Sequence, residues 1–127
     1  MMPVISCGGM RYQFKWQDVD PKEIPRTNQE NLEACIHRAL ELGIHHIETA
    51  RGYGTSEMQL GNVLPKLPRE KIIVQTKIMP KATVKEFLET FETSMKYLGL
   101  ERSHEIEHQS VDWNFAYLKR FVAGFYT

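Results

Sequence analysis

The sequence predicts an α/β fold built on a parallel sheet, and three observations lead to this prediction. Short apolar segments alternate with helical patterns, in the order strand then helix, three times along residues 4–100. Each helical segment opens with the spacing of a capping box, and two of them close on a glycine. One apolar segment is a continuous β-branched run, which is typical of a strand buried on both faces. Strands that alternate with helices in this way are joined by right-handed crossovers and run parallel.

Three short strands are predicted. The first, Val4–Cys7, is followed by a two-glycine turn. The second, Ile44–Ile47, contains two adjacent histidines, which face opposite sides of a sheet and so do not ligate one metal easily. We expect both histidines to be structural, one in the interior of the sheet and one under a helix. The third strand, Lys71–Thr76, holds the β-branched run.

Three helices are predicted between and after these strands. Gly43 and Gly99 stand where the first and third helices should stop. The capping-box pairs are Thr27 with Glu30, Ser56 with Gln59, and Thr83 with Glu86. The apolar faces at helical spacing consist of Leu32, Cys35, Ile36 and Ala39; Met58, Leu60, Val63 and Leu64; and Val84, Phe87, Leu88, Phe91 and Leu98.

Composition restricts the classes of function. The 127 residues suffice for one domain with a core, and their formal net charge is zero. A neutral chain lacks the basic surplus that binds nucleic acid through its phosphates. No apolar run has the length of a membrane span, and the amino terminus does not read as a signal peptide. Two cysteines are too few for a disulfide framework, so we expect a cytoplasmic protein with no zinc site.

The residues with chemical potential cluster around the second and third strands. Glu48 follows the second strand, Tyr53 lies between two glycines in the next loop, and Lys77 follows the third strand. The carboxyl ends of neighbouring parallel strands open onto one rim, so these three side chains can converge there. A phenol is a weak acid at neutral pH, and a nearby ammonium favours its ionised form. The alternative is that Tyr53 packs its loop while Glu48 and Lys77 form an interior ion pair.

This pattern resembles the aldo-keto reductases. The resemblance rests on Glu48-Thr49-Ala50, Tyr53-Gly54, Ser56-Glu57, Leu60-Gly61 and Thr76-Lys77, at matching spacing from about residue 4 to residue 100. It implies part of a (β/α)8 TIM barrel and NADPH-dependent reduction of a small-molecule carbonyl to an alcohol. From the charge and the apolar runs we expect no nucleic-acid or membrane partner. The resemblance also implies that Tyr53 is the general acid, Lys77 its modulator, and Glu48 the partner of Lys77. Glu48, Gly9 and Met10 are the residues expected at the cofactor.

The chain departs from the family pattern in two ways. Glu48 stands where the family has aspartate, and the resemblance fails after Leu100. A complete barrel takes about 250 residues, so we expect residues 1–100 to supply its first three strand-helix units and to be inactive alone. Residues 101–127 are expected to be a divergent tail, either a helix or unselected sequence. His108 lies near the position of the family's histidine, and whether it replaces that histidine stays open.

Two further alternatives remain open. The chain can be a non-catalytic β/α fragment, stabilised by a partner or by self-association through exposed sheet edges. The aromatic residues Tyr12, Phe14 and Trp16 can line a substrate mouth or pack on the rim, and packing is the more frequent role.

Overall fold

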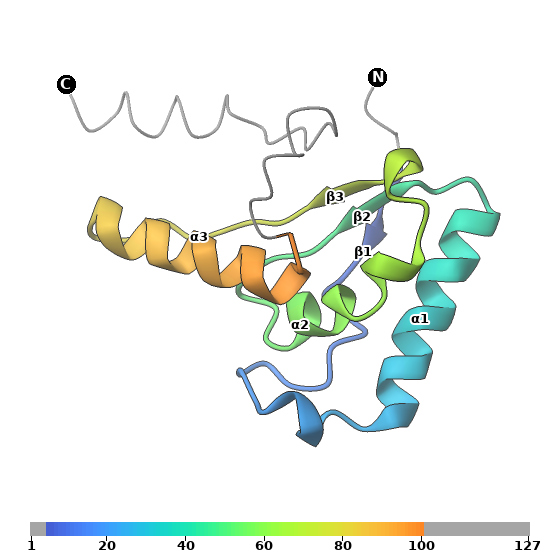
Figure 1. Ribbon diagram of the computed structural model, residues 1–127, viewed down its shortest axis with the longest axis horizontal. Helices are drawn as coiled ribbons and strands as arrows, with labels where there is room; N and C mark the ends of the chain where they lie inside the picture. The colour runs from blue at the N-terminus through green and yellow to red at the C-terminus, as the bar shows by residue number, and fades with distance from the viewer. Residues whose placement is uncertain (1–4, 101–127) are drawn as a thin grey trace.

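A three-stranded parallel sheet forms the centre of the protein, in a computed structural model that describes residues 5–100. The strands are β1 (Cys7–Gly8), β2 (His46–Glu48) and β3 (Ile73–Gln75), in the order β1-β2-β3 (Figure 1). Ile47 pairs with Cys7 on one side and with Val74 on the other. The predicted parallel α/β fold is confirmed, and its three strand-helix units form part of a (β/α)8 barrel.

All three strands are shorter than predicted. Ile44 is not in β2, because its N–H donates to the carbonyl of Ala39 and closes the end of the preceding helix. Lys71 is not in β3, because it belongs to a 3-10 turn, Arg69–Lys71. The first strand reaches Gly8, whereas Val4 lies outside the described residues.

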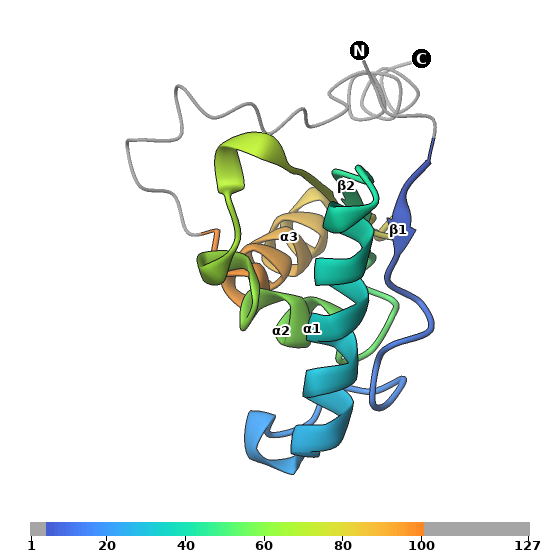
Figure 2. The same cartoon turned by 90° about the vertical axis from the view of Figure 1, so that its right-hand side faces the viewer.

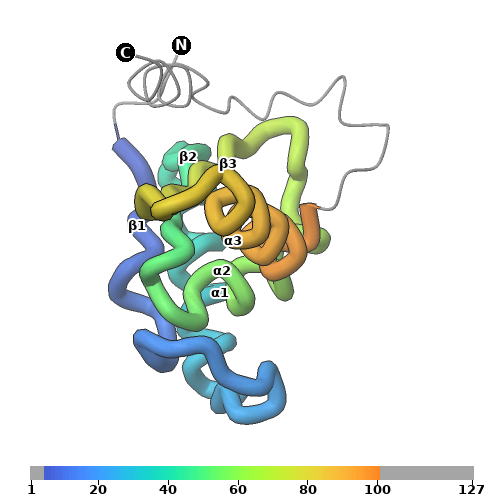
Figure 3. Tube along the Cα trace, turned by 90° about the vertical axis from the view of Figure 1, so that its left-hand side faces the viewer, coloured from blue at the N-terminus to red at the C-terminus, as the bar shows by residue number. Residues whose placement is uncertain are grey.

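The helices are α1 (Arg26–Glu41), α2 (Ser56–Gly61) and α3 (Val84–Leu98), and they cover one side of the sheet (Figures 1 and 2). Helix α2 lies between α1 and α3 and contacts both, as Figure 3 also shows. It is shorter than predicted, because the chain turns at its end into a 3-10 segment, Leu64–Lys66. Another 3-10 turn, Pro21–Glu23, precedes α1. Among residues 5–100 no helix is long and apolar enough to cross a membrane.

The glycine stops predicted for α1 and α3 are both confirmed. Gly43 and Gly99 have positive φ angles of 77° and 66°. At each helix end two backbone N–H groups donate to carbonyls of the last turn. Gly43 donates to Leu40 and Gly99 to Lys96. The residues that follow, Ile44 and Leu100, donate to Ala39 and Met95. This is the Schellman arrangement, which satisfies carbonyl groups that a helix end leaves open.

Of the three predicted capping boxes, only Thr83 with Glu86 forms. The Thr27–Glu30 box is wrong, because α1 begins one residue earlier with Pro25 as its N-cap. The Pro25 carbonyl accepts from two N–H groups of the first turn, and Glu30 bonds to Arg26 instead. The Ser56–Gln59 box is also wrong, since Thr55 is the N-cap of α2 and makes no side-chain capping bond.

The core lies between the sheet and the helices. Ile47 of β2 is fully buried there, against Leu32 and Ile36 of α1 and Leu60 of α2. Successive strand residues point to opposite faces. Since Ile47 faces the helices, Glu48 faces the other side of the sheet.

Several predicted core positions are exposed. Cys35 is exposed, and Leu40 packs against the core in its place. Val84 and Leu88 are 75% and 51% exposed, because the amino-terminal half of α3 extends beyond α2 (Figure 1). Trp16 is 55% exposed and does not pack, whereas Tyr12 is buried as expected.

Of the two histidines of the second strand segment, one agrees with expectation and the other does not. His46 is buried at 6% exposure, but His45 is exposed and lies under no helix. His45 precedes the strand, which begins at His46. The predictions for His108 and for the tail, residues 101–127, fall outside the described residues.

Candidate functional site

The structure brings Glu48, Tyr53 and Lys77 together at the carboxyl ends of β2 and β3. The Nζ of Lys77 donates to the phenol oxygen of Tyr53 at 2.6 Å and forms an ion pair with a carboxylate oxygen of Glu48. The same Nζ lies 4.7 Å from the centroid of the Tyr53 ring. The phenol oxygen accepts from the ammonium, so its own hydrogen is available to another acceptor.

The surroundings of the Lys77 amine favour its charged form. Partial burial would by itself lower the pKa of Lys77, but hydrogen bonds to Glu48 and Tyr53 outweigh it, and the pKa is raised. The side chains of Lys77 and Glu48 are 47% and 19% exposed, so the pair lies at the rim and not in the core. A charged amine therefore contacts the phenol at neutral pH.

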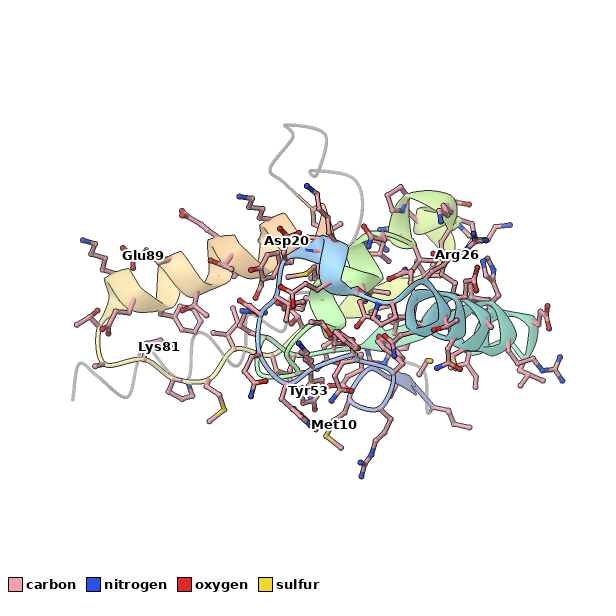
Figure 4. The ribbon with its side chains drawn as sticks, turned by 90° about the horizontal axis from the view of Figure 1, so that it is seen from below. Met10, Asp20, Arg26, Tyr53, Lys81 and Glu89 are labelled. Carbon is pink, nitrogen blue, oxygen red and sulfur yellow. The ribbon has the colours of Figure 1, made fainter. Side chains whose placement is uncertain are left out.

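Gly8, the last residue of β1, and the following Gly9 pack directly on Glu48. The N–H of Gly9 donates to the Glu48 carbonyl at 2.7 Å. A Cβ at Gly9 would lie 2.7 Å from that carbonyl oxygen and from the Tyr12 hydroxyl, so only glycine fits here. At Gly8 a Cβ would lie 3.7 Å from the Glu48 carboxylate. Met10 follows at 37% exposure, on the same side of the molecule as Tyr53 in the view of Figure 4.

Ser56 and Gln59 serve the loops around the site, which is why they do not cap α2. The Ser56 hydroxyl lies 2.7 Å from that of Thr49 and donates to the Gly9 carbonyl at 3.0 Å. The Gln59 carbonyl oxygen accepts from the Phe14 N–H at 2.9 Å, and its amide donates to Asn28 at 2.6 Å. These bonds tie the loop that follows β1 to α2.

An ion-pair network that the sequence reasoning missed lies beside Tyr53 and Lys77. Glu57 of α2 is fully buried, and its Oε2 accepts from Arg51 at 3.1 Å. Arg51 also pairs with Asp18, and its guanidinium lies 4.8 Å from the Tyr97 ring centroid. Burial alone would lower the pKa of Arg51, but the bonds to Asp18 and Glu57 raise it. A glutamate at a core-facing helix position needs a counter-ion, and this was the signal available in the sequence.

An open hollow on the described surface lies outside the triad of Glu48, Tyr53 and Lys77. It has a volume of about 400 Å³ and is lined mainly by charged and hydroxyl side chains. Lys81 and Glu89, labelled in Figure 4, belong to this lining along with Arg51. Because the hollow includes none of the triad, we place the candidate site at the triad on chemical grounds.

Comparison with known proteins agrees with the geometry. The model of the family described as the aldo/keto reductase family matches residues 4–119, and so extends past Leu100, where the resemblance was expected to end. A curated relative, the NADH-specific methylglyoxal reductase of Escherichia coli K12, is 48% identical over 50 residues, which cover 35% of this chain and 15% of that protein.

Two solved structures from Pseudomonas aeruginosa, each carrying the description "putative aldo-keto reductase", match in fold. Their TM-scores are 0.61 and 0.59, with 24% and 23% identity over 91% of this chain. They show the same fold, and the chain spans about half the length of each, 50% and 49%.

Proposed function

The chain belongs to the aldo/keto reductase family, and we propose that its described residues supply the proton-donating side of a nicotinamide-dependent carbonyl reduction. The observation that carries this proposal is the 2.6 Å hydrogen bond from Lys77 to the Tyr53 phenol, with Glu48 paired to the same amine. An ion pair alone would not require a phenol at this point. The phenol makes the cluster an acid as well as a charge pair.

Each residue of the triad has a distinct role in the proposed reaction. Reduction of a carbonyl requires a hydride at carbon and a proton at oxygen, and a bound nicotinamide supplies the hydride. Tyr53 donates its phenol proton to the carbonyl oxygen. The Lys77 ammonium stabilises the phenolate that this transfer leaves behind. Glu48 holds the ammonium charged and against the phenol. A positioned general acid of this kind contributes roughly 10²- to 10⁴-fold in rate.

The residues beside Glu48 fit a nicotinamide cofactor. Gly8 has no side chain and is exposed beside Glu48, so a flat ring can approach its backbone closely, and Gly9 is buried behind it against Glu48. Gly9, Met10 and Glu48 would hold the ring next to the acid. We propose NADPH, as the family resemblance implies. NADH is the alternative, because the Escherichia coli relative is named NADH-specific.

We propose further that these 127 residues do not complete the reaction alone. Among residues 5–100 the sheet has three strands, so β1 and β3 are both edges within that part of the chain. A closed barrel that binds the whole cofactor needs further strands and loops. We expect the protein to work in the cytoplasm, in keeping with its two free cysteines.

The experiment uses two forms of the protein. The 127-residue chain is titrated with NADPH and NADH by fluorescence, and we expect no micromolar binding. The chain is then joined to the carboxyl-terminal half of the Escherichia coli relative, and oxidation of each cofactor is followed with methylglyoxal and other small carbonyls. We expect carbonyl-dependent oxidation of a nicotinamide cofactor. A correctly folded fusion that oxidises neither cofactor contradicts the proposed activity.

Self-association is a second candidate, favoured by the two edge strands and by exposed apolar residues next to β3 and on α3. These residues include Met79, which is 72% exposed, and Val84. A non-catalytic fragment of this kind would pair with itself or with a partner chain through the edges. Light scattering distinguishes the two candidates, because a well-folded monomer that remains monomeric at high concentration counts against this one.

A further inference from the structure

Lys77 and Tyr53 meet through long side chains that lie near the surface, so the backbone on each side has to fix their separation. Tyr53 lies in the β2–α2 loop, and Lys77 follows β3 by two residues. The Arg51 N–H donates to the Lys77 carbonyl at 2.9 Å, which joins the two segments directly. A shift of about 1 Å between catalytic groups can cost on the order of 100-fold in rate.

The carboxylate of Glu57 bridges the same two segments. Its Oε2 accepts from the Arg51 guanidinium at 3.1 Å, two residues before Tyr53. Its Oε1 accepts from the Thr76 hydroxyl at 2.6 Å, one residue before Lys77. Glu57 is fully buried on α2 and cannot exchange these partners for water.

We propose that Glu57 is a positioning residue for the Tyr53–Lys77 pair, holding Arg51 and Thr76 at one fixed separation through its two carboxylate oxygens. This inference rests on the proposed function, since it assigns Glu57 a part in preparing the acid. Glu57 touches neither the phenol nor the amine, and acts through the residues that flank them.

A purely structural role for Glu57 is the competing explanation. Breaking a buried ion pair by removing one partner destabilises the fold wherever the pair lies. A loss of stability in a Glu57 variant therefore does not distinguish the two roles. The ionisation of the Lys77 amine does, because it depends on contact with Glu48 and Tyr53, the titratable groups beside it.

The test measures how fast Lys77 reacts with acetic anhydride as a function of pH, by mass spectrometry of the labelled peptide. The midpoint of the profile reports the pKa of the amine, and the plateau reports its accessibility. The experiment needs only the 127-residue chain and does not depend on turnover. Glu48→Gln serves as the benchmark, since it removes the charge that contacts the amine.

Two variants test the proposal, each with a matched control. Glu57→Gln keeps the shape of the side chain but removes its charge, and Thr76→Val removes only the hydroxyl. Their controls are Glu30→Gln, which breaks an exposed pair with Arg26, and Thr90→Val, which removes a hydroxyl bonded to its own helix.

We expect the Lys77 midpoint to move to lower pH in Glu48→Gln, Glu57→Gln and Thr76→Val, and to stay in place in both controls. Labelling below the midpoint then rises several-fold, because each pKa unit changes the free amine tenfold. If Glu57→Gln fails to fold, Thr76→Val decides alone. Wild-type midpoints in both variants, with a shift in Glu48→Gln, overturn the positioning role and leave the proposed function intact. An unshifted midpoint in Glu48→Gln counts against the proposed function itself.

Discussion

Gly61 holds α2 and α3 at close range, and replacing it with alanine should destabilise the protein. A Cβ at Gly61 would lie 1.9 Å from the carbonyl oxygen of Tyr97 and 3.0 Å from its carbonyl carbon. Both atoms belong to the backbone of α3, so no side-chain rotation relieves the overlap. The two helices form the most extensive contact between elements of the described fold, so any separation affects a large surface.

The cost follows from the displacement. Bringing the new contact to an ordinary 3.4 Å requires α3 to move by roughly 1.5 Å. A gap of about 0.5–1 Å already loses a quarter to a half of the dispersion attraction across an interface. Overpacked substitutions typically cost about 1–3 kcal/mol, and the rigidity of this contact places Gly61→Ala near the upper end, about 3 kcal/mol. That is a large share of the roughly 5–15 kcal/mol that stabilises a typical domain.

Urea unfolding followed by circular dichroism measures the effect, and Gly52→Ala is the matched control. A Cβ at Gly52 meets nothing within 4 Å, and its φ is not positive. With an m value of about 1.5 kcal/mol/M, Gly61→Ala should lower the midpoint by about 2 M, whereas Gly52→Ala should leave it unchanged or raise it slightly. Equal midpoints for the two variants would refute the close packing of α2 on α3.

Two further predictions concern the amino terminus of α3 and the alkaline limit of the fold. Thr83→Ala removes the capping bond from the Glu86 N–H to the Thr83 hydroxyl, while the Thr83 N–H still donates to Glu86, and should cost about 1 kcal/mol in urea unfolding; a loss below about 0.3 kcal/mol would show that the hydroxyl bond contributes nothing. Burial raises the pKa of Tyr12 above its ordinary value of 10.0, so the stability this phenol contributes is present below pH 10.0 and is lost at higher pH. Tyr12→Phe should therefore lose less stability than the wild type between pH 9 and pH 11 in thermal melts, and parallel losses would contradict the buried, neutral phenol.

Features set by neighbouring residues were predictable from the sequence. The alternation of strands and helices, the glycine stops and the Thr83 capping box depend on interactions within a few residues, and all are present. The meeting of Glu48 with Lys77 also followed from local spacing. Both lie at the carboxyl ends of adjacent parallel strands, and those ends open onto the same rim of the sheet.

Features set by distant residues were not predictable. Ser56 has the spacing of a cap, but Gly9, 47 residues away, accepts its hydrogen bond. The partner of the buried Glu57 depends on how the β2–α2 loop folds, which no local pattern specifies. Val84 continues an apolar face on α3, yet its exposure is set by where α2 ends.

The turnover of Tyr53→Phe in the fusion with the carboxyl-terminal half of the Escherichia coli relative tests the central claim most directly. The substitution removes one hydroxyl and keeps the ring over the Lys77 amine, so the melting temperature should match that of the unsubstituted fusion. We predict that kcat for carbonyl reduction falls by at least about 100-fold, as loss of a general acid requires. An unchanged kcat in a fully folded Tyr53→Phe fusion would contradict the assignment of Tyr53 as the proton donor.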